Sequence, residues 1–231
     1  MNRTIAIIGG TGAQGSGLAW RWARAGETVV IGSRDPARAA ACAESIRQRF
    51  PAARITGQSN ADAVAQADIV VLTVPFPAHI RLLKQLRPAL TRPAVLVDTT
   101  VPLEATLGGS PTRLLSLWKG SAAELTASLV PETVQVAAAF HTVSAELLQG
   151  EGPLESDVLV CADHALARRL TCQLAEKIPG VRAIDAGGLD GARLLEHLTA
   201  LLIRLNVRYR ITDAGVRFTG LPLSGTPHGQ D

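Results

Sequence analysis

A glycine-rich turn near the amino terminus constrains the fold of this chain more than any other feature. The turn follows an apolar, β-branched run, Thr4–Ile8, and precedes a helical pattern of apolar residues; its glycines are Gly10, Gly12 and Gly15. Glycines in the spacing G-x-G-x-x-G allow a tight turn, a close approach of the backbone to a pyrophosphate, and close packing of the helix on the strand. The stretch therefore predicts a Rossmann-type unit that binds a dinucleotide.

Strand-like runs then alternate with helical patterns, which is typical of a doubly wound parallel α/β sheet. The predicted strands are Thr4–Ile8, Thr28–Ile31, Arg54–Thr56, Ile69–Thr73, Ala94–Asp98 and Gln135–Ala139. The predicted helices are Ala37–Arg49, Asn60–Gln66, Ala78–Leu90 and Ser121–Leu129. Asn60 is predicted to cap its helix, and Ser121 with Glu124 forms a capping box. The segment 102–120 is predicted to be a long loop.

The end of the second predicted strand indicates which nicotinamide cofactor fits. NAD sites normally carry an acidic residue there, which accepts hydrogen bonds from the ribose 2′-hydroxyl. Here the chain reads Gly32-Ser33-Arg34, and a hydroxyl beside a permanently charged guanidinium suits a 2′-phosphate. Arg38 either adds a second charge to that phosphate or lies on a solvated helix face, and Asp35 can cap the helix between them. The predicted cofactor is NADP(H).

A smaller α/β pattern follows the nucleotide-binding part. Its predicted elements are the strand Asp157–Cys161, the helix Ala165–Lys177, the strand Val181–Asp185 and a helix from Asp190 to about Tyr209. We therefore predict an NADP-binding Rossmann domain at 1–140, a small C-terminal lobe for acceptor binding and dimerisation at 141–219, and a flexible tail at 220–231. One face of the last helix carries leucines that indicate core packing or a dimer seam: Leu194, Leu198, Leu201, Leu202 and Leu205.

Composition excludes several other classes of protein. The 231 residues are 47% hydrophobic with a mean hydropathy of +0.19, enough for a folded core. No apolar run reaches the roughly 18 residues of a membrane span, and the first strand begins too early to leave room for a signal peptide, so we predict a cytoplasmic protein. The net charge is only +3 and the basic residues are dispersed, which argues against nucleic-acid binding. Three cysteines without CxxC spacing predict no metal site.

The sequence contains no familiar acid–base apparatus. Its single tyrosine, Tyr209, is followed four residues later by Asp213, so the Tyr-x-x-x-Lys pair of short-chain dehydrogenases is absent, as are HExxH and G-x-S-x-G. Polar residues do follow the predicted strands, where open α/β sheets bind ligands. They lie in Thr73-Val74-Pro75 with His79 beyond, in Thr99-Thr100-Val101-Pro102, and in His141-Thr142.

Short motifs also recur along the chain in a characteristic order. They are Gly9-Gly-Thr-Gly12, Gly32-Ser33-Arg34, Leu72-Thr-Val-Pro75, Ser121-Ala-Ala-Glu124, Phe140-His-Thr-Val143, Asp185-Ala-Gly-Gly-Leu189 and Arg193-Leu-Leu-Glu196. Together, from Ile5 to about Phe218, the sequence resembles the NADP oxidoreductases that use the deazaflavin coenzyme F420. The nucleotide domain also resembles the cytoplasmic part of the STEAP metalloreductases, which pass hydride from NADPH to a flavin.

The resemblance implies hydride transfer directly between nicotinamide C4 and deazaflavin C5, so the protein mainly has to hold two rings face to face. It also implies site residues at matching positions. For the phosphates these are Thr11, Gly12, Ala13, Gln14, Ser33, Arg34 and Arg38; for the nicotinamide, Val74, His79, Val101 and Ala145; for the acceptor, His141 and Arg193, with His197 beside them.

Other readings of these residues stay open. His141 can instead cap a strand end, Arg193 can be solvated or ion-paired, and His79 can be a helix-start residue that only brushes the cofactor. His197 stands where the family pattern has a small hydroxyl residue, and Ser144 stands where it has a proline.

Three functions are consistent with the sequence. The first is an NADPH-dependent F420 reductase that forms a homodimer, in which the small lobe pairs two chains and completes each acceptor pocket. The second, favoured by His197, is an NADPH-dependent reductase of FAD, FMN or a small imine or ketone. The third is a non-catalytic NADP-binding sensor.

Overall fold

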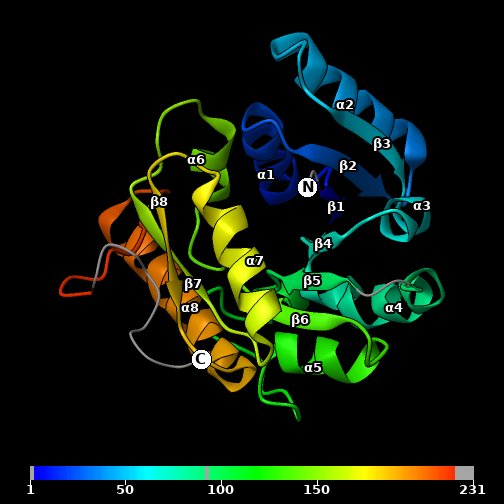
Figure 1. Ribbon diagram of the computed structural model, residues 1–231. Coiled ribbons are helices and arrows are strands. Elements are labelled where there is room, and N and C mark those ends of the chain that lie inside the picture. Colours follow the sequence, from blue (N-terminus) through cyan, green and yellow to red (C-terminus); the bar gives the residue numbers. More distant parts are fainter. Residues whose placement is uncertain (1–2, 92–93, 222–231) are drawn as a thin grey trace.

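A six-stranded parallel sheet forms the centre of the computed structural model, which describes residues 3–91 and 94–221 (Figure 1). Its strands are β1 (Thr4–Ile8), β2 (Thr28–Ser33), β3 (Ile55–Ser59), β4 (Ile69–Leu72), β5 (Val95–Asp98) and β6 (Gln135–Ala138). They lie in the order β3-β2-β1-β4-β5-β6, so the order reverses between β1 and β4. Ligands bind at the carboxyl ends of the strands beside such a switch point. The predicted Rossmann-type α/β fold is confirmed.

Helices cover both faces of this sheet, which is why its strands are almost continuously apolar. The helices of this part are α1 (Ala13–Arg24), α2 (Pro36–Arg49), α3 (Asn60–Ala65), α4 (Phe76–Leu86) and α5 (Ala122–Leu129), with short 3₁₀ turns at Arg87–Ala89 and Glu104–Leu107. Successive strand residues point to opposite faces. In β1, Ile5 and Ile7 pack with side chains of α1 and α2, whereas Ala6 and Ile8 pack with those of α3 and α4.

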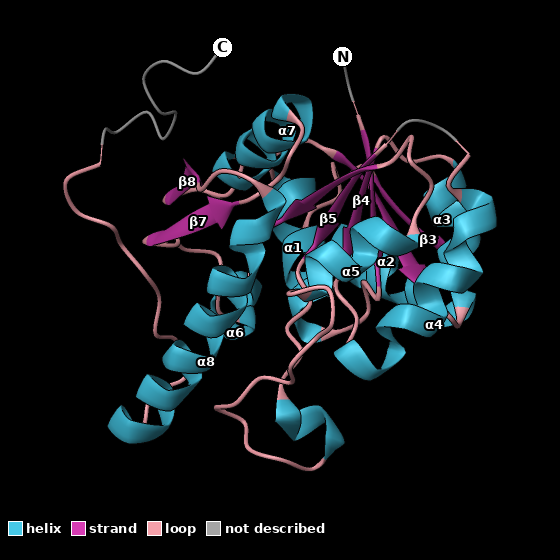
Figure 2. Ribbon diagram, turned by 90° about the horizontal axis from the view of Figure 1, so that it is seen from below, coloured by secondary structure: helices cyan, strands magenta, loops and turns pink. Residues whose placement is uncertain are grey.

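A separate two-stranded parallel sheet follows in the chain. It consists of β7 (Ser156–Val160) and β8 (Val181–Asp185), connected by α7 (Ala165–Glu176), and it is flanked by α6 (Ala145–Gln149) and α8 (Ala192–Tyr209). Figure 2 shows this pair apart from the fan of six strands. An isolated antiparallel bridge between Ala138 and Cys161 connects β6 with the residue after β7.

Side chains of α1 attach the small unit to the large one. The buried Arg21 guanidinium donates hydrogen bonds to three carbonyl oxygens at and beyond the end of α6, those of Leu147, Leu148 and Gly152. The indole of Trp22 donates to the carbonyl oxygen of Leu174 in α7 at 3.0 Å. Because α1 follows the glycine turn directly, these bonds fix the small unit relative to the nucleotide-binding part.

Several predicted details were wrong. Ser59, not Asn60, caps α3, because its hydroxyl accepts the Asp62 N–H. The helix α4 begins at Phe76 rather than Ala78, since Pro77 needs no N–H partner in a first turn. The segment 102–120 is a loop as predicted, and it additionally contains a 3₁₀ turn and a bridge between Leu103 and Leu114.

Other predicted details agree with the structure. Ser121 accepts the Glu124 N–H at 3.1 Å, which is one half of the predicted capping box, while the Glu124 carboxylate accepts the Ser121 hydroxyl at 2.7 Å; Asp35 caps α2. Of the predicted tail, only Gly220 and Leu221 belong to the described residues.

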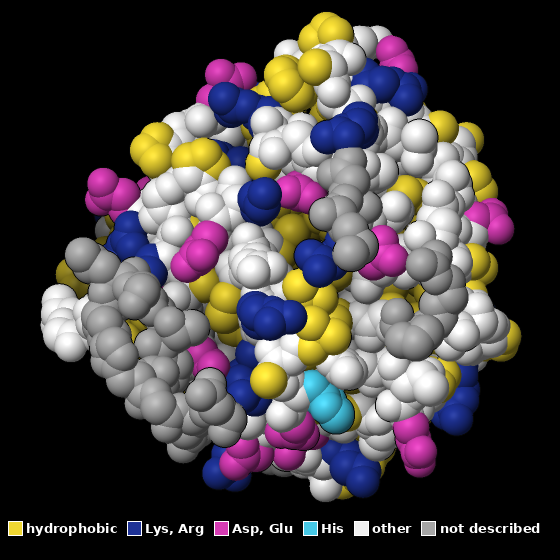
Figure 3. Space-filling model, viewed as in Figure 1, with side chains coloured by type: hydrophobic (Ala, Val, Ile, Leu, Met, Phe, Trp, Pro, Cys, Tyr) yellow, Lys and Arg dark blue, Asp and Glu magenta, His cyan; other side chains and the backbone are white. Residues whose placement is uncertain are grey.

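The leucine face of α8 is divided. Leu202 is buried, but Leu194 and Leu201 are 66% and 50% exposed, so core packing accounts for only part of the face. Among the residues described, no helix is long and apolar enough to cross a membrane. On the molecular face in Figure 3, Lys and Arg are interspersed with Asp and Glu rather than gathered in one patch.

Glu196 attaches the other side of α8 to the nucleotide-binding part. Its buried carboxyl group accepts the backbone N–H of Ala122, the first residue of α5, at 2.7 Å. Burial raises the pKa of Glu196 to about 8, and the carboxylates of Asp98 and Glu124 act in the same direction, against the backbone N–H groups of α5.

This raised pKa predicts a pH dependence of stability. The folded protein holds the Glu196 proton more tightly than the unfolded chain, whose pKa is near 4.5, so the free energy of unfolding falls as pH rises from there to about 8. Glu196→Gln keeps the carbonyl acceptor without the titration. The free energy of unfolding of Glu196→Gln minus that of the parent should therefore increase by roughly 1–3 kcal/mol as the pH rises from about 5 to about 9, measured by urea unfolding. Glu176→Gln is the control, because Glu176 is exposed. If the free energies of unfolding of Glu196→Gln and of the parent change with pH in parallel, the prediction is contradicted.

Candidate functional site

A single cleft with a volume of about 1600 Å³ lies at the carboxyl ends of the central strands and reaches α8. Its walls come from the turn after β1, the ends of β2 and β4, the segment after β5, and one side of α4. From the small unit it takes residues around the start of α6 and the side chains of Thr199 and Ile203 in α8. This volume is at the large end for a small-molecule site and gives room for more than one ligand.

The glycines of the opening turn have two different tasks. A Cβ at Gly10 would lie 2.7 Å from the Ile7 carbonyl oxygen, and one at Gly15 would lie 2.6 Å from the Thr73 hydroxyl. These two glycines permit close packing inside the fold and do not line the cleft. Gly12 does line it, together with its neighbours Thr11, Ala13 and Gln14.

The start of α1 suits an anion. Its N-cap is Gly12, which offers no side chain to the helix, and the first turn carries no acidic residue. The first N–H groups of a helix lack partners within the helix, and together with the helix dipole they favour negative charge. A pyrophosphate therefore fits where the resemblance places it.

The side chains at the end of β2 suit a second anion. Ser33, Arg34 and Arg38 all line the cleft, and neither arginine forms an ion pair with any residue of the described part of the chain. Asp35 is engaged as the cap of α2, accepting the Ala37 N–H at 3.0 Å. The two guanidinium groups are thus free to take a 2′-phosphate without first breaking a salt bridge.

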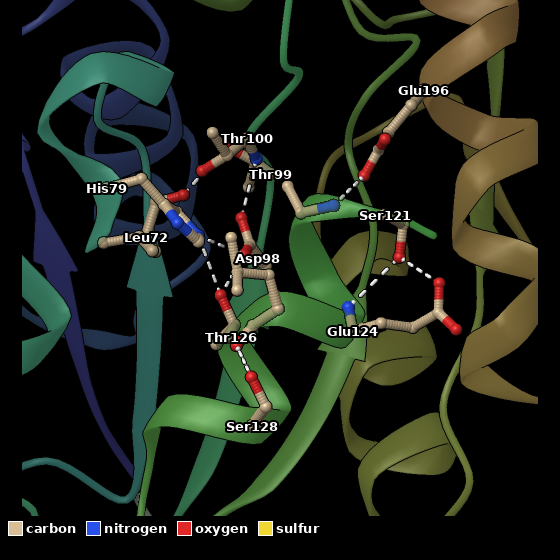
Figure 4. A network of polar contacts seen from close by, with 12 residues as sticks. Leu72, His79, Asp98, Thr99, Thr100, Ser121, Glu124, Thr126, Ser128 and Glu196 are labelled. Atoms are coloured by element: carbon tan, nitrogen blue, oxygen red, sulfur yellow. Dashed lines mark hydrogen bonds and ion pairs between the residues drawn. The ribbon is translucent and has the colours of Figure 1, made fainter. Parts of the chain in front are cut away.

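The four residues predicted at the nicotinamide are not equivalent. Val74, Val101 and Ala145 line the cleft. His79 does not: its side chain is 0% exposed and its Nε2 lies 2.9 Å from Asp98 Oδ2 and 2.8 Å from the Thr126 hydroxyl (Figure 4). The ring of His79 therefore lies behind the wall of the cleft.

His141 lies at the inner end of the cleft on a strained piece of backbone. The preceding Phe140 has a φ of +65°, unusual for a residue with a side chain, and is held by a hydrogen bond from the Gln14 amide to its carbonyl oxygen at 3.1 Å. The Phe140 ring also meets the Trp22 ring edge-on, with centroids 5.6 Å apart. The packing of the Phe140 ring and the hydrogen bond from the Gln14 side chain thus hold the backbone that positions His141.

The imidazole of His141 is neutral and available. Burial lowers its pKa to about 4, although the charge of Asp98 and the polar backbone of the nearby Thr100 act against this shift. Both ring nitrogens are buried and have no hydrogen-bond partner among the described residues. Buried polar atoms without partners are uncommon in native proteins and suit a ligand. Its side chain does not act as a strand cap.

Arg193 and His197 lie elsewhere. Both are on the exposed side of α8 and outside the cleft, and His197 Nδ1 is 2.6 Å from the Arg193 carbonyl oxygen. The face of α8 that lines the cleft carries Thr199 and Ile203 instead. The Thr199 hydroxyl donates to the carbonyl oxygen of His141 at 2.8 Å and so connects α8 with the inner end of the cleft.

Further cleft residues had not been predicted as site residues; besides Thr199 and Ile203 they include Asn60 and Arg81. Thr99 and Thr100 also line the cleft and had been singled out only as polar residues after a strand, without a role. Thr99 and Thr100 followed a predicted strand, which was a usable signal, whereas the orientation of α4 and α8 left none. No cluster of three or more potential metal ligands occurs in the residues that the structure describes.

Comparisons with known proteins agree with this geometry. Residues 4–102 match the family model described as NADP oxidoreductase coenzyme F420-dependent. The F420-dependent NADP reductase of Methanothermobacter thermautotrophicus is 49% identical over 94% of this chain and 95% of its own length. Rat metalloreductase STEAP3 is 32% identical over 84% of this chain but only 36% of its own length, in agreement with the resemblance to one part of those proteins.

A solved structure extends the likeness to three dimensions. The crystal structure of a putative F420-dependent NADP reductase from Arthrobacter has a TM-score of 0.79 and 27% identity, covering 94% of this chain and 99% of that one. The likeness to the F420-dependent reductases, in sequence and in fold, thus extends over nearly the whole length of both this chain and its relatives. The chain belongs to the family of F420-dependent NADP reductases.

Proposed function

We propose that this protein is an enzyme that transfers a hydride between NADP(H) and the deazaflavin coenzyme F420. One observation carries the proposal: a single cleft of about 1600 Å³ runs from two arginines that form no ion pair within the described part of the chain, past a helix start suited to an anion, to an inner end with a neutral histidine. The phosphate end fits NADP(H), and the volume leaves room for a second ring system.

The nucleotide is held by charge at one end of the cleft. Ser33, Arg34 and Arg38 bind the 2′-phosphate, and the backbone from Thr11 to Gln14 binds the pyrophosphate. When bound, NADP(H) supplies the hydride at C4 of its nicotinamide. Val74, Val101 and Ala145 line the region that holds this ring.

At the acceptor end the residues orient rather than exchange protons. His141 is neutral at physiological pH and offers one donor and one acceptor nitrogen to a ligand. Holding two reactants in a near-attack geometry supplies a large part of a barrier reduction by itself. A hydride transfer between two rings thus needs no acid–base pair. Arg193 and His197 lie on the exposed side of α8, outside the cleft of their own chain, and do not line its acceptor end.

His197 was the sequence feature that favoured a flavin, an imine or a ketone as the acceptor, and the structure removes this argument. His197 does not line the cleft and so does not reduce the room for a deazaflavin there. To test the function, the absorbance of NADPH is followed with F420, with FMN or FAD, and with cyclic imines. We expect oxidation of NADPH with F420 and much slower oxidation with the others; preference for a flavin or an imine, or no oxidation at all, would contradict the proposal.

The preference for NADP over NAD depends on the arginines. Arg34→Asp places a negative charge where the 2′-phosphate binds, so the ratio of kcat/KM for NADPH to that for NADH should fall by about 100-fold or more. Arg169→Asp is the control, because Arg169 is exposed on α7 and the change of charge is the same. An unchanged ratio in Arg34→Asp would refute the assignment of the 2′-phosphate.

The proposed oligomer is a homodimer formed through α8. The outer face of this helix exposes Leu194, Leu201 and Tyr209, with the half-buried Leu198 and Leu205 between them. Two copies of one apolar helix face are self-complementary about a twofold axis, and such a pairing would bring the Arg193 side of α8 next to a second chain. The cytoplasmic location remains a prediction from the sequence.

The dimer is tested by a charge in the helix face. Leu201→Glu should convert the protein to a monomer in size-exclusion chromatography with light scattering, because two buried carboxylates would face each other across the interface. Leu166→Glu, on the exposed side of α7, should leave the mass unchanged. A dimer that persists in Leu201→Glu would exclude this face.

A further inference from the structure

Three side chains that are 0% exposed form a closed polar cluster behind the wall of the cleft (Figure 4). They are Asp98 at the end of β5, His79 of α4 and Thr126 of α5; we call them the Asp98 cluster. The Thr126 hydroxyl donates to Asp98 Oδ2 at 2.5 Å, and His79 Nε2 lies 2.9 Å from the same oxygen and 2.8 Å from the hydroxyl. Because the Thr126 hydroxyl donates its proton to the hydrogen bond with Asp98, His79 Nε2 must be a protonated donor toward these two oxygens.

The Asp98 cluster touches the cleft at two places. The other carboxylate oxygen, Asp98 Oδ1, accepts the backbone N–H of Thr100 at 2.8 Å, and Thr99 and Thr100 line the cleft. On the opposite side the ring of His79 stacks on the ring of Phe76, which also lines the cleft, with centroids 5.7 Å apart and planes at 26°. The buried carboxylate of Asp98 thus holds the Thr99-Thr100 turn after β5 directly and Phe76, in the cleft wall after β4, through His79.

The turn after β5 is itself connected to the nucleotide turn. The Thr99 hydroxyl donates to the Leu72 carbonyl oxygen at 2.9 Å and lies 3.2 Å from the side-chain oxygen of Gln14. Gln14 in turn holds Phe140, the residue before His141. A shift of Thr99 and Thr100 would therefore be transmitted both to the phosphate end and to the acceptor end of the cleft.

We propose that the Asp98 cluster positions the Thr99-Thr100 turn and Phe76 so that the two reacting rings are held at hydride-transfer distance. The proposal rests on the hydride transfer proposed above. Asp98, His79 and Thr126 are positioning residues, since none of them lines the cleft. Hydride transfer is sensitive to displacements of about 1 Å, so a wall that is free to move would slow the reaction.

Stability alone is a poor reason for such a cluster. Burying an ionised carboxylate is costly, and apolar side chains of similar size often give equal or greater stability than a buried charged group. Burial raises the pKa of Asp98, yet its hydrogen bond and charge interaction with His79, and its bonds with Thr126 and Thr100, keep the pKa below its usual range. His79 Nδ1 has no hydrogen-bond partner among the described residues, but hydrogen bonds from three segments to one carboxylate favour one arrangement of the segments they join.

The test removes the buried hydroxyl of Thr126, which does not line the cleft. Thr126→Val keeps the shape of the side chain but leaves Asp98 Oδ2 with His79 alone. We expect kcat with NADPH and F420 to fall about tenfold, and the primary isotope effect with NADPH deuterated at the transferred C4 position to rise, because the hydride step becomes slower. The Kd of NADPH should change less than about twofold, since the proposed 2′-phosphate contacts of Ser33, Arg34 and Arg38 come from β2 and the start of α2 and are left intact.

Two further variants separate positioning from stability. Thr126→Ser restores the hydroxyl and should restore both kcat and the isotope effect. Thr171→Val is the matched control, because Thr171 in α7 is equally buried but its hydroxyl has no partner among the described residues; it should change neither value.

A lower Tm for Thr126→Val with an unchanged kcat and isotope effect would overturn the proposal. If Thr126→Val does not fold, Asp98→Asn, which keeps the size of the side chain and removes its charge, decides by the same measurements. Absence of hydride transfer to F420 in the parent protein would instead contradict the proposed function. Normal transfer in the parent and in both variants would contradict only the positioning role.

Discussion

The close contact of α1 with the central strands at Gly15 is the constraint on which the rest of the structure depends. A Cβ at Gly15 would lie 2.6 Å from the Thr73 hydroxyl and 2.7 Å from Gly10 Cα, so any other residue would push the helix away from β1 and β4. With glycine there, the start of α1 points its free N–H groups into the switch point of the sheet. The same helix carries Arg21 and Trp22, whose hydrogen bonds hold α6 and α7. One contact thus determines both the anion site and the attachment of the small unit.

The cleft changes in electrostatic character from one end to the other. At the outer end Arg34 and Arg38 have no ion-pair partner among the described residues, and the start of α1 follows, so the anionic part of a dinucleotide is attracted there. The inner end is neutral, because burial keeps His141 uncharged and the charge of Asp98 is held behind the wall by hydrogen bonds. A ligand with phosphates at one end and an uncharged reactive ring near the other therefore has one favourable orientation.

The fixed orientation of α8 about its own axis determines which of its side chains line the cleft. Leu195 and Leu202 are buried in the protein and the Glu196 carboxyl group accepts the Ala122 N–H, which together turn Thr199 and Ile203 toward the cleft. The same rotation leaves Leu194 and Leu201 exposed and keeps the side chains of Arg193 and His197 out of the cleft. The helix is therefore a wall of the cleft on one side and an unpaired apolar surface on the other.

The sequence by itself determined those features that depend on near neighbours in the chain. The glycine spacing predicted the turn, Ser33 and Arg34 predicted a phosphate at the end of β2, and alternating apolar patterns predicted the parallel sheet. Only the tertiary structure decided the rest: that His79 lies behind the wall with Asp98 and Thr126, and that Thr199 rather than His197 lines the cleft. The physical reason is that a turn is formed by local backbone geometry, whereas the direction of a helical side chain depends on how the whole helix packs against distant segments.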